Sequence, residues 1–411
     1  MYSIMKAKNE AAHKEIDDFL KELLKISSVS LNEKKAAELI CAEMKRLDYD
    51  EAFIDDAGNA VGIMRGREAE PAIILNSHID TVSPDAAGWK MDPFGGMIQN
   101  GMIFGAGASD CKGGIASQLY SRALLKRSLL PMRGTLVFAA TVAEENGCSI
   151  GLRELMSGTI PSLGIKAEYA ILGEPTENRL YYGHDGWVEI NIHIEGVNPF
   201  HVTDTAKSIN RDLSKIAGFR GGDISIPQEM TINSPVYNEQ GKNGFKTADI
   251  HVSKRLRETE NAENAVQWLS HEVGTMTKNE KNIAVDVEVM SEKQRLYNGR
   301  TSVVKKVVNA WQTDPFSPLI QRSRQSLAAA GCEVRTGKWK LGRLGMGTAG
   351  SVLSEEFKIQ TIGFGPGKED CAHANDEYVM LENVHQNAYG TAAIVHSLIG
   401  VPVCGWTSDE I

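Results

Sequence analysis

The sequence predicts an α/β fold with a mostly parallel sheet flanked by helices, into which a smaller α+β domain of two layers is inserted. The 411 residues exceed what one hydrophobic core usually organises. Short apolar runs alternate with helical patterns up to residue 174, which is typical of α/β proteins. Strict alternation then replaces this pattern at 187–197, and α/β character resumes beyond about 300.

The first part of the chain predicts helices that alternate with buried strands. Apolar residues recur at helical spacing in two segments, 10–26 and 33–47. A short apolar run at 72–75 is typical of a strand buried on both faces of a sheet. After it we expect a helix at 114–127, a strand at 135–141, a helix at 149–157 and a strand at 169–174. In such sheets ligands gather beyond the carboxyl ends of the strands.

The middle of the chain predicts a separate domain. Val188, Ile190, Ile192 and Ile194 alternate with polar residues, as in a half-exposed antiparallel strand. A helix at 205–218, a strand at 246–253 and a helix at 261–276 are expected to follow. We therefore expect one domain formed by residues 1–186 and 300–411, with residues 187–299 inserted into it.

Composition excludes several classes of protein. The net charge of -9 argues against nucleic acid as the main partner, because phosphate binding needs a basic face. No stretch approaches the roughly 20 apolar residues that span a bilayer, and the N-terminal segment lacks the pattern of a secretory signal. The six cysteines are widely spread, which indicates reduced thiols. We therefore expect a cytoplasmic protein that does not enter a membrane.

His78 and Asp80 are the first candidates for a metal site. A hydrolytic metal site needs imidazole and carboxylate ligands together with an open position for water. These two residues are two apart after an expected strand, which places their side chains on one side of an extended segment. We interpret His78 as a ligand and Asp80 as the acceptor of its second ring N–H. Taken alone, such a pair is more typical of surface polar residues.

Further candidates follow the other expected strands. Glycines around Asp110 let the backbone approach a site closely, so Asp110 is a candidate bridge between two cations; the alternative is an ordinary turn into a helix. The adjacent Glu144 and Glu145 are either two solvated acids or, in a metal site, one ligand and one base. Glu174 ends an apolar strand, and His373 lies in a loop. Each residue taken alone is weak evidence for a metal site, but the residues together favour one.

The order of these segments resembles a known family. SHIDTV, GAGASDCKGG, AEENG, GEPT and CAHANDE occur as in the metal-dependent aminoacylase, acetylornithine deacetylase, succinyl-diaminopimelate desuccinylase and carboxypeptidase G family. Within it, GWKMDPFGGMIQNGMIFGAGASDCKGGIAS, LYYGHDGWVEI and GFGPGKEDCAHANDE look most like the selenium-metabolism-linked hydrolase branch. The match is strong over about 14–190 and 300–400 and weak in the inserted domain.

The resemblance implies a hydrolase with two metal ions, usually zinc. Asp110 matches the bridging carboxylate. His78 and Glu174 match the other ligands of one ion, and Glu145 and His373 those of the second. Glu144 matches the general base, and the peptide bond after Asp110 is expected to be cis. Cobalt, manganese and nickel suit the same nitrogen and oxygen ligands.

The resemblance also implies that the inserted domain acts as a lid and as a dimerisation domain. His201 resembles the lid histidine that stabilises the developing oxyanion in the partner subunit, although Phe200 stands where the family has a small residue. Arg255 resembles the lid arginine that grips a substrate carboxylate; the alternative is a surface arginine. We expect a homodimer through this domain, with the segment 187–197 as an exposed edge strand.

Together these residues predict hydrolysis of an amide bond in a small carboxylate-bearing substrate, such as an N-acyl amino acid or a short peptide. One alternative is an N-carbamoyl or ureido amidohydrolase on the same scaffold. Another is a catalytically silent relative that only binds metal, although Glu144 argues against it because such a site needs no base. Cys111, Cys148 and Cys371 lie near these residues, and we interpret them as small buried residues rather than soft ligands.

Overall fold

The chain divides into two compact units, which are described separately. The computed structural model describes residues 2–85, 87–146, 148–218, 230–238, 246–257, 260–334 and 343–401. The first unit comprises Met1–His184, Gln294–Ser302 and Trp311–Ile411, and the second Asp185–Lys293 and Val303–Ala310. The second unit thus has limits different from the expected insert at 187–299, and its role as a lid stays a prediction.

A six-stranded sheet forms the centre of the first unit. Its strands lie in the order β1 (Glu51–Ile54), β2 (Ala60–Met64), β6 (Thr135–Thr141), β3 (Ala72–His78), β7 (Ala167–Leu172) and β19 (Gln360–Gly363). The last four strands in this order run parallel, and β2 is antiparallel to both of its neighbours. The mostly parallel sheet that the sequence predicted is therefore confirmed.

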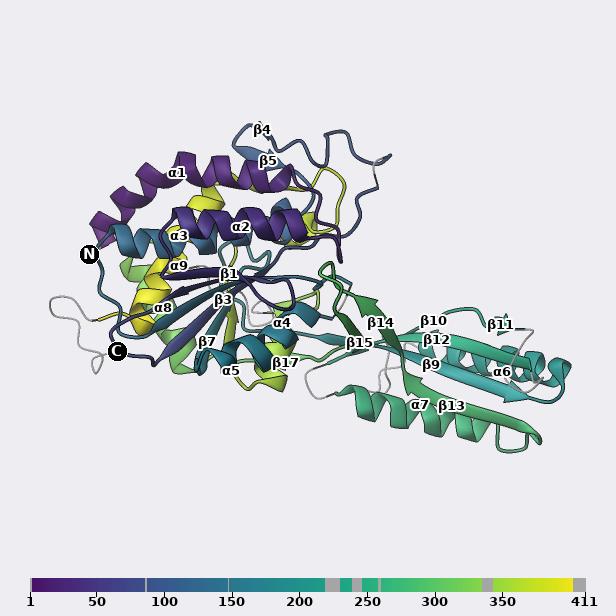
Figure 1. Cartoon of the computed structure of the whole chain (residues 1–411). Coiled ribbons are helices and arrows are strands. Elements are labelled where there is room, and N and C mark those ends of the chain that lie inside the picture. The colour runs from purple at the N-terminus through teal and green to yellow at the C-terminus, as the bar shows by residue number, and fades with distance from the viewer. Residues whose placement is uncertain are drawn as a thin grey trace. The chain divides into compact units, whose positions relative to one another are not determined.

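Helices cover both faces of this sheet (Figure 1). One face carries α2 (Lys34–Arg46), α3 (Gly113–Arg127) and α9 (Leu381–Ile399), and α1 (Tyr2–Leu24) packs on α3 and α9. The helix α8 (Pro318–Ala329) also packs on α9. On the other face α4 (Ile150–Glu154) and α5 (Ile160–Ser162) bury Leu152 and Ile160 against sheet residues such as Ile74 and Val137. Burial on both faces explains why the inner strands β2, β3 and β6 are buried along their whole length.

Short strands complete the first unit and its connections. The described residues form three small sheets: β4 (Met97–Gln99), β5 (Met102–Phe104) and β20 (Tyr378–Met380); β8 (Gly183–His184), β17 (Trp311–Gln312) and β18 (Arg343–Leu344); and β14 (Ser291–Arg295) with β15 (Thr301–Lys305). Among the residues described, no helix is long and apolar enough to cross a membrane.

Most of the expected boundaries in the first unit hold with small shifts, but α1 begins at Tyr2, eight residues before the expected 10–26, and α4 ends at Glu154, where a π-helical turn at Leu155–Thr159 follows. The strand at 135–141 has those bounds, and the run at 72–75 continues to His78. The strand expected at 169–174 already ends at Leu172, so Glu174 lies in the loop beyond it. Pro175 follows Glu174, and proline disfavours helical conformation in the residue before it, so no helix begins at this point.

The second unit packs two helices against one antiparallel sheet. Its elements are β9 (Gly186–Gly196), α6 (Pro199–Gly218), β10 (Met230–Ile232), β11 (Val236–Asn238), β12 (Lys246–Leu256), α7 (Ala262–Met276), β13 (Ile283–Val289) and β16 (Val307–Val308). Buried and half-buried residues alternate along all of β9, as the sequence predicted. The buried side chains of β9 and β12 form one core with Val202, Leu213 and Leu269 of the two helices.

The expectation that 187–197 forms an exposed edge strand is wrong. The strand β9 lies inside the sheet, because β12 pairs with one of its edges and β13 with the other. Alternating burial reports only that one face of a strand packs on a core, and it carries no information on the strand's edges. An exposed edge strand at 187–197 therefore no longer supports the expected homodimer.

The helix α6 begins six residues earlier than the expected 205–218. Asn198 caps its first turn, since its side-chain oxygen accepts a hydrogen bond from the amide of Phe200 at 2.9 Å. Pro199 suits the first helical position because its ring fixes φ. As a consequence His201 lies on the first turn of a helix and not in a loop.

Candidate metal centre

The candidate ligands follow the carboxyl ends of neighbouring parallel strands. His78 is the last residue of β3, Glu145 follows β6 by four residues, and Glu174 follows β7 by two. His373 lies in the loop after β19, while Asp110 lies in the distorted π-helical turn Ala108–Lys112 that leads into α3. Because these parallel strands end at the same edge of the sheet, residues distant in sequence converge there.

The five candidates form two groups that share Asp110. In one group ligand atoms of His78, Asp110, Glu174 and Cys111 lie within 4.8 Å of one another, and in the other those of Asp110, Glu145 and His373 do. The Nε2 atom of His78 lies 3.1 Å from Oδ1 of Asp110. The Nε2 atom of His373 lies 3.4 Å from Oδ2 of Asp110 and 2.7 Å from Oε1 of Glu145.

These groups fit divalent metal ions in two respects. The Oδ2 atom of Asp110 is buried and accepts no hydrogen bond from the described residues, with Nε2 of His373 as an ion-pair partner at 3.4 Å, and a buried carboxylate oxygen without a hydrogen bond is stabilised when a cation binds it. The other donors are imidazole nitrogens and carboxylate oxygens, the set that zinc and similar ions take. The peptide bond after Asp110 is cis, as the resemblance implied.

The electrostatics of the cluster are dominated by carboxylates close together. Burial raises the pKa of Glu144 to about 8, and the charges of Glu145, Asp80 and Asp110 add to this rise. Burial and neighbouring carboxylates likewise raise the pKa of Glu174 well above its ordinary value. Burial alone would raise the pKa of Asp110 too, but its contacts with two imidazoles hold it below the usual range. Bound cations would relieve this mutual repulsion.

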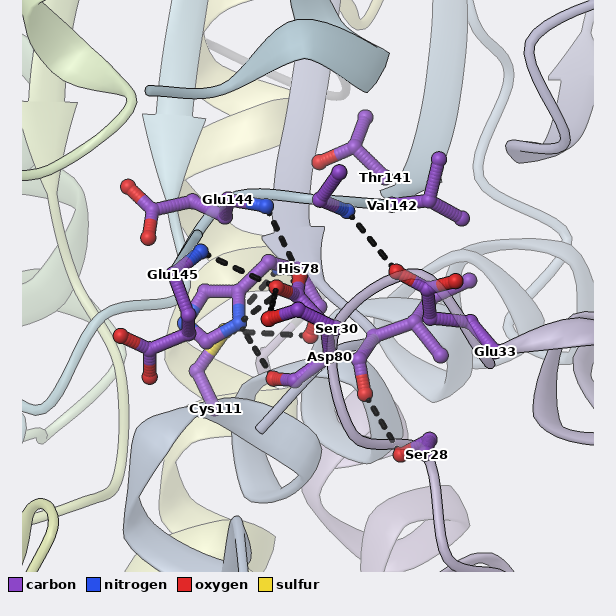
Figure 2. Close-up of polar contacts among 12 residues, drawn as sticks. Ser28, Ser30, Glu33, His78, Asp80, Cys111, Thr141, Val142, Glu144 and Glu145 are labelled. Carbon is purple, nitrogen blue, oxygen red and sulfur yellow. Dashed lines mark hydrogen bonds and ion pairs between the residues drawn. The ribbon is translucent and has the colours of Figure 1, made fainter. Parts of the chain in front are cut away.

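The carboxylate of Asp80 does not accept the ring N–H of His78, as the sequence suggested, but has other hydrogen-bond partners. The Nδ1 atom of His78 lies 2.8 Å from the main-chain carbonyl of Asp80, and the carboxylate is farther away at 3.7 Å. The carboxylate instead accepts hydrogen bonds from the amides of Glu144 at 2.9 Å and Glu145 at 3.0 Å and from the Ser30 hydroxyl at 2.7 Å (Figure 2). Asp80 therefore holds the loop that presents both glutamates.

Glu33 is a second support of this loop, and it was missed from the sequence. Its carboxylate is buried and accepts a hydrogen bond from the amide of Ala143 at 3.1 Å. Ala143 has a left-handed backbone with φ of 53°, which is unfavourable for alanine, so this hydrogen bond helps to hold it. No motif marks Glu33, because its partner is a main-chain amide more than a hundred residues away in sequence. In Figure 2 the side chains of Glu144 and Glu145 both point away from Asp80.

A cavity of about 150 Å³ adjoins the second ligand group. Asp110, Glu145 and His373 line one part of it, and Val82, Asp85 and Trp89 are among the residues that line the rest. A larger cavity of about 380 Å³ involves residues of α1 and α9 and none of the candidate ligands. Cavity size alone therefore does not locate the chemistry, whereas the convergence of ligands does.

His201 and Arg255 belong to the second unit, whereas the ligand cluster is built from the first unit alone. The Nε2 atom of His201 lies 2.5 Å from Oε2 of Glu280. The guanidinium of Arg255 lies 3.3 Å from a carboxylate oxygen of Asp185. Their roles toward a substrate stay predictions.

Comparison with known proteins identifies the family. The model of peptidase family M20/M25/M40 matches residues 74–397. The uncharacterized protein YgeY of Escherichia coli K12 is 27% identical over 379 residues, covering 87% of this chain and 88% of YgeY. A putative LysW-lysine/LysW-ornithine hydrolase of Thermococcus kodakarensis is 26% identical over 365 residues, with 89% and 86% covered. The di-peptidase Dug1p of Saccharomyces cerevisiae superposes with a TM-score of 0.68 at 14% identity, with 97% and 98% covered.

The chain therefore belongs to peptidase family M20/M25/M40, because the family model covers most of its length. It is an enzyme, a metal-binding hydrolase of amide bonds. The family resemblance inferred from the sequence motifs is confirmed.

We expect Cys111 to resist alkylation in the folded, metal-free protein. Its side chain is fully buried, and burial raises the pKa of its thiol to about 12, so very little reactive thiolate is present at about pH 8. Labelling with iodoacetamide followed by mass spectrometry measures the rate, with the only partly buried Cys332 and the urea-unfolded chain as controls. Equal labelling of Cys111 in folded and unfolded protein would contradict this expectation. Inhibition by thiol reagents through Cys111 is therefore not expected.

Proposed function

We propose that this chain hydrolyses an amide bond in a small carboxylate-bearing substrate, an N-acyl amino acid or a short peptide, with two divalent metal ions. The observation that carries the proposal is the position of Asp110 between His78 and His373, at 3.1 and 3.4 Å from their nearest ring nitrogens. One carboxylate between two groups of ligands is the arrangement that holds two ions side by side.

The ligand groups suggest how the ions would be held. His78, Asp110 and Glu174 would hold one ion, and Asp110, Glu145 and His373 the other. We propose zinc, with cobalt, manganese and nickel as alternatives that suit the same donors. When bound, two such ions lower the pKa of a water molecule and polarise the scissile carbonyl.

Glu144 is the proposed general base. Asp80 fixes its main chain, and the Ser149 hydroxyl donates to its Oε1 at 3.3 Å. In the folded chain without metal, burial raises the pKa of Glu144 to about 8, and bound cations would lower it, so that the ionised carboxylate can accept a proton. Glu144 takes the proton of the attacking water and then passes it to the leaving nitrogen, which completes the cleavage.

We further propose that the enzyme is a cytoplasmic homodimer and that His201 stabilises the developing oxyanion of the partner subunit's substrate. Arg255 is the proposed contact for the substrate carboxylate. No disulfide joins the cysteines in the described part of the chain, which fits a reducing compartment. The likeness to the selenium-metabolism-linked branch stays a prediction.

The Glu144→Gln variant should lose turnover but keep its metal ions. Glutamine keeps the shape of the side chain but cannot accept the proton of water, so we expect kcat to fall by at least about a hundredfold. Steady-state kinetics and metal analysis measure the two properties on the same sample. Glu168→Gln, the same change on β7 away from the ligands, serves as the control. Unchanged turnover in Glu144→Gln would refute the mechanism.

A panel of substrates separates the proposed activity from its rivals. We expect metal-stripped enzyme reconstituted with zinc, cobalt, manganese or nickel to hydrolyse N-acyl amino acids or dipeptides faster than N-carbamoyl amino acids. Release of the free amino acid is the readout. Preference for the carbamoyl compounds would establish the ureido amidohydrolase instead. Metal binding without hydrolysis of any compound would indicate the silent relative.

Mixed dimers test whether His201 acts across subunits. The variants Glu144→Gln and His201→Ala should each be nearly inactive alone. Co-expression should restore roughly a quarter of wild-type activity, because half of randomly paired dimers are mixed and each holds one intact site. His193→Ala is a matched control that should stay active, since His193 has the same 38% side-chain exposure as His201 and also pairs with an acid. No restored activity in the mixed dimers would rule out the arrangement in trans.

A further inference from the structure

Glu377 is a buried carboxylate to which no role has been given above. It lies four residues after His373 and is 4% exposed. Its Oε1 accepts hydrogen bonds from the amides of Ser109 and Asp110, both at 2.9 Å. Its Oε2 accepts one from the amide of Gly107 at 2.8 Å. All three donors belong to the short segment that ends at the candidate shared ligand.

This segment cannot satisfy its own amides. Gly107 has a left-handed backbone with φ of 82°, and Asp110 departs from helical geometry with φ of -127° and ψ of 92°. The amides of a buried segment with irregular backbone need partners from elsewhere, because an unpaired buried N–H costs free energy. One carboxylate with two oxygens supplies acceptors for three of them. Gly107 to Asp110 therefore depends on Glu377 for its conformation.

Further contacts tie the Glu377 segment to the same loop. The carbonyl of Glu377 accepts a hydrogen bond from the amide of Gly105 at 2.9 Å, and the carbonyl of Tyr378 accepts one from the Ser109 hydroxyl at 2.9 Å. The strands β20 and β5 extend this pairing. Since His373 lies on the same segment as Glu377, these contacts set the spacing between His373 and Asp110.

We propose that Glu377 is a positioning residue of the metal centre, which places the carboxylate of Asp110 where both ligand groups can use it. This inference rests on the proposed metal-binding function. A carboxylate is required because glutamine offers only one oxygen, and its NH2 group would face a backbone N–H that needs an acceptor. Glu377 belongs to neither ligand group, and both of its oxygens accept hydrogen bonds from amides.

The test compares Glu377→Gln with Asp376→Asn in the full-length protein. We expect Glu377→Gln to bind zinc about 10- to 100-fold more weakly, the usual cost of losing a support behind a ligand. Asp376 also accepts main-chain amides, those of Lys90 and Met91, but all through one oxygen that asparagine retains. Asp376→Asn therefore controls for the loss of one negative charge and should bind zinc like the wild type.

Zinc affinity is measured by competition with a chelator, and the unfolding midpoint of each metal-free variant by circular dichroism. Weaker zinc binding by Glu377→Gln at a nearly unchanged unfolding midpoint supports a positioning role. General destabilisation of the fold would lower the midpoint as well. Wild-type affinity in Glu377→Gln, or equal losses in both variants, overturns it. Failure of the proposed hydrolysis is a separate result, because zinc affinity is measured without turnover.

Hydrogen exchange on the wild type decides the question if Glu377→Gln does not fold. The amides of Gly107, Ser109 and Asp110 should be protected in the metal-free protein, because Glu377 holds them before any ion binds. Exchange is followed by mass spectrometry on peptides that span 104–112, with and without zinc. Protection that arises only when zinc is added would show that the ion orders the loop, and it would overturn the proposal.

Discussion

The mutual repulsion of carboxylates is the constraint on which this structure depends. Asp110, Glu144, Glu145 and Glu174 gather at one edge of the sheet, where burial raises the cost of their negative charges. Such a cluster is stable only if cations neutralise it and if the backbone that carries it is fixed. The first requirement explains why the site suits metal ions. The second explains much of the surrounding architecture.

Carboxylates behind the cluster meet the second requirement. The carboxylate of Asp80 accepts hydrogen bonds from the amides of Glu144 and Glu145, and that of Glu33 accepts one from the amide of Ala143. The carboxylate of Glu377 accepts hydrogen bonds from the amides of Gly107, Ser109 and Asp110. Each of these hydrogen bonds gives a main-chain amide of an irregular loop an acceptor that the loop itself does not supply. These buried acids thus hold irregular loops in the shape that the proposed ligands require, and they do so from elements far apart in sequence.

The fold of the second unit follows from apolar packing. Its sheet is antiparallel and covered by α6 and α7, so its strands alternate between buried and half-buried residues. Nothing in this pattern depends on a metal ion, and the unit has its own apolar core. His201 and Arg255, the residues proposed to contact substrate, lie on this separately packed unit.

The sequence by itself predicted the mostly parallel sheet and several of its helices and strands, because local apolar periodicity reports these directly. It also proposed the five candidate ligands, from polar motifs at strand ends and from the resemblance of their order to a known family. Tertiary structure alone decided that β9 is an inner strand and that the carboxylate of Asp80 faces the amides of Glu144 and Glu145. It also decided the roles of Glu33 and Glu377. Their partners are main-chain amides, which every residue carries, so no pattern of side chains along the sequence marks these contacts.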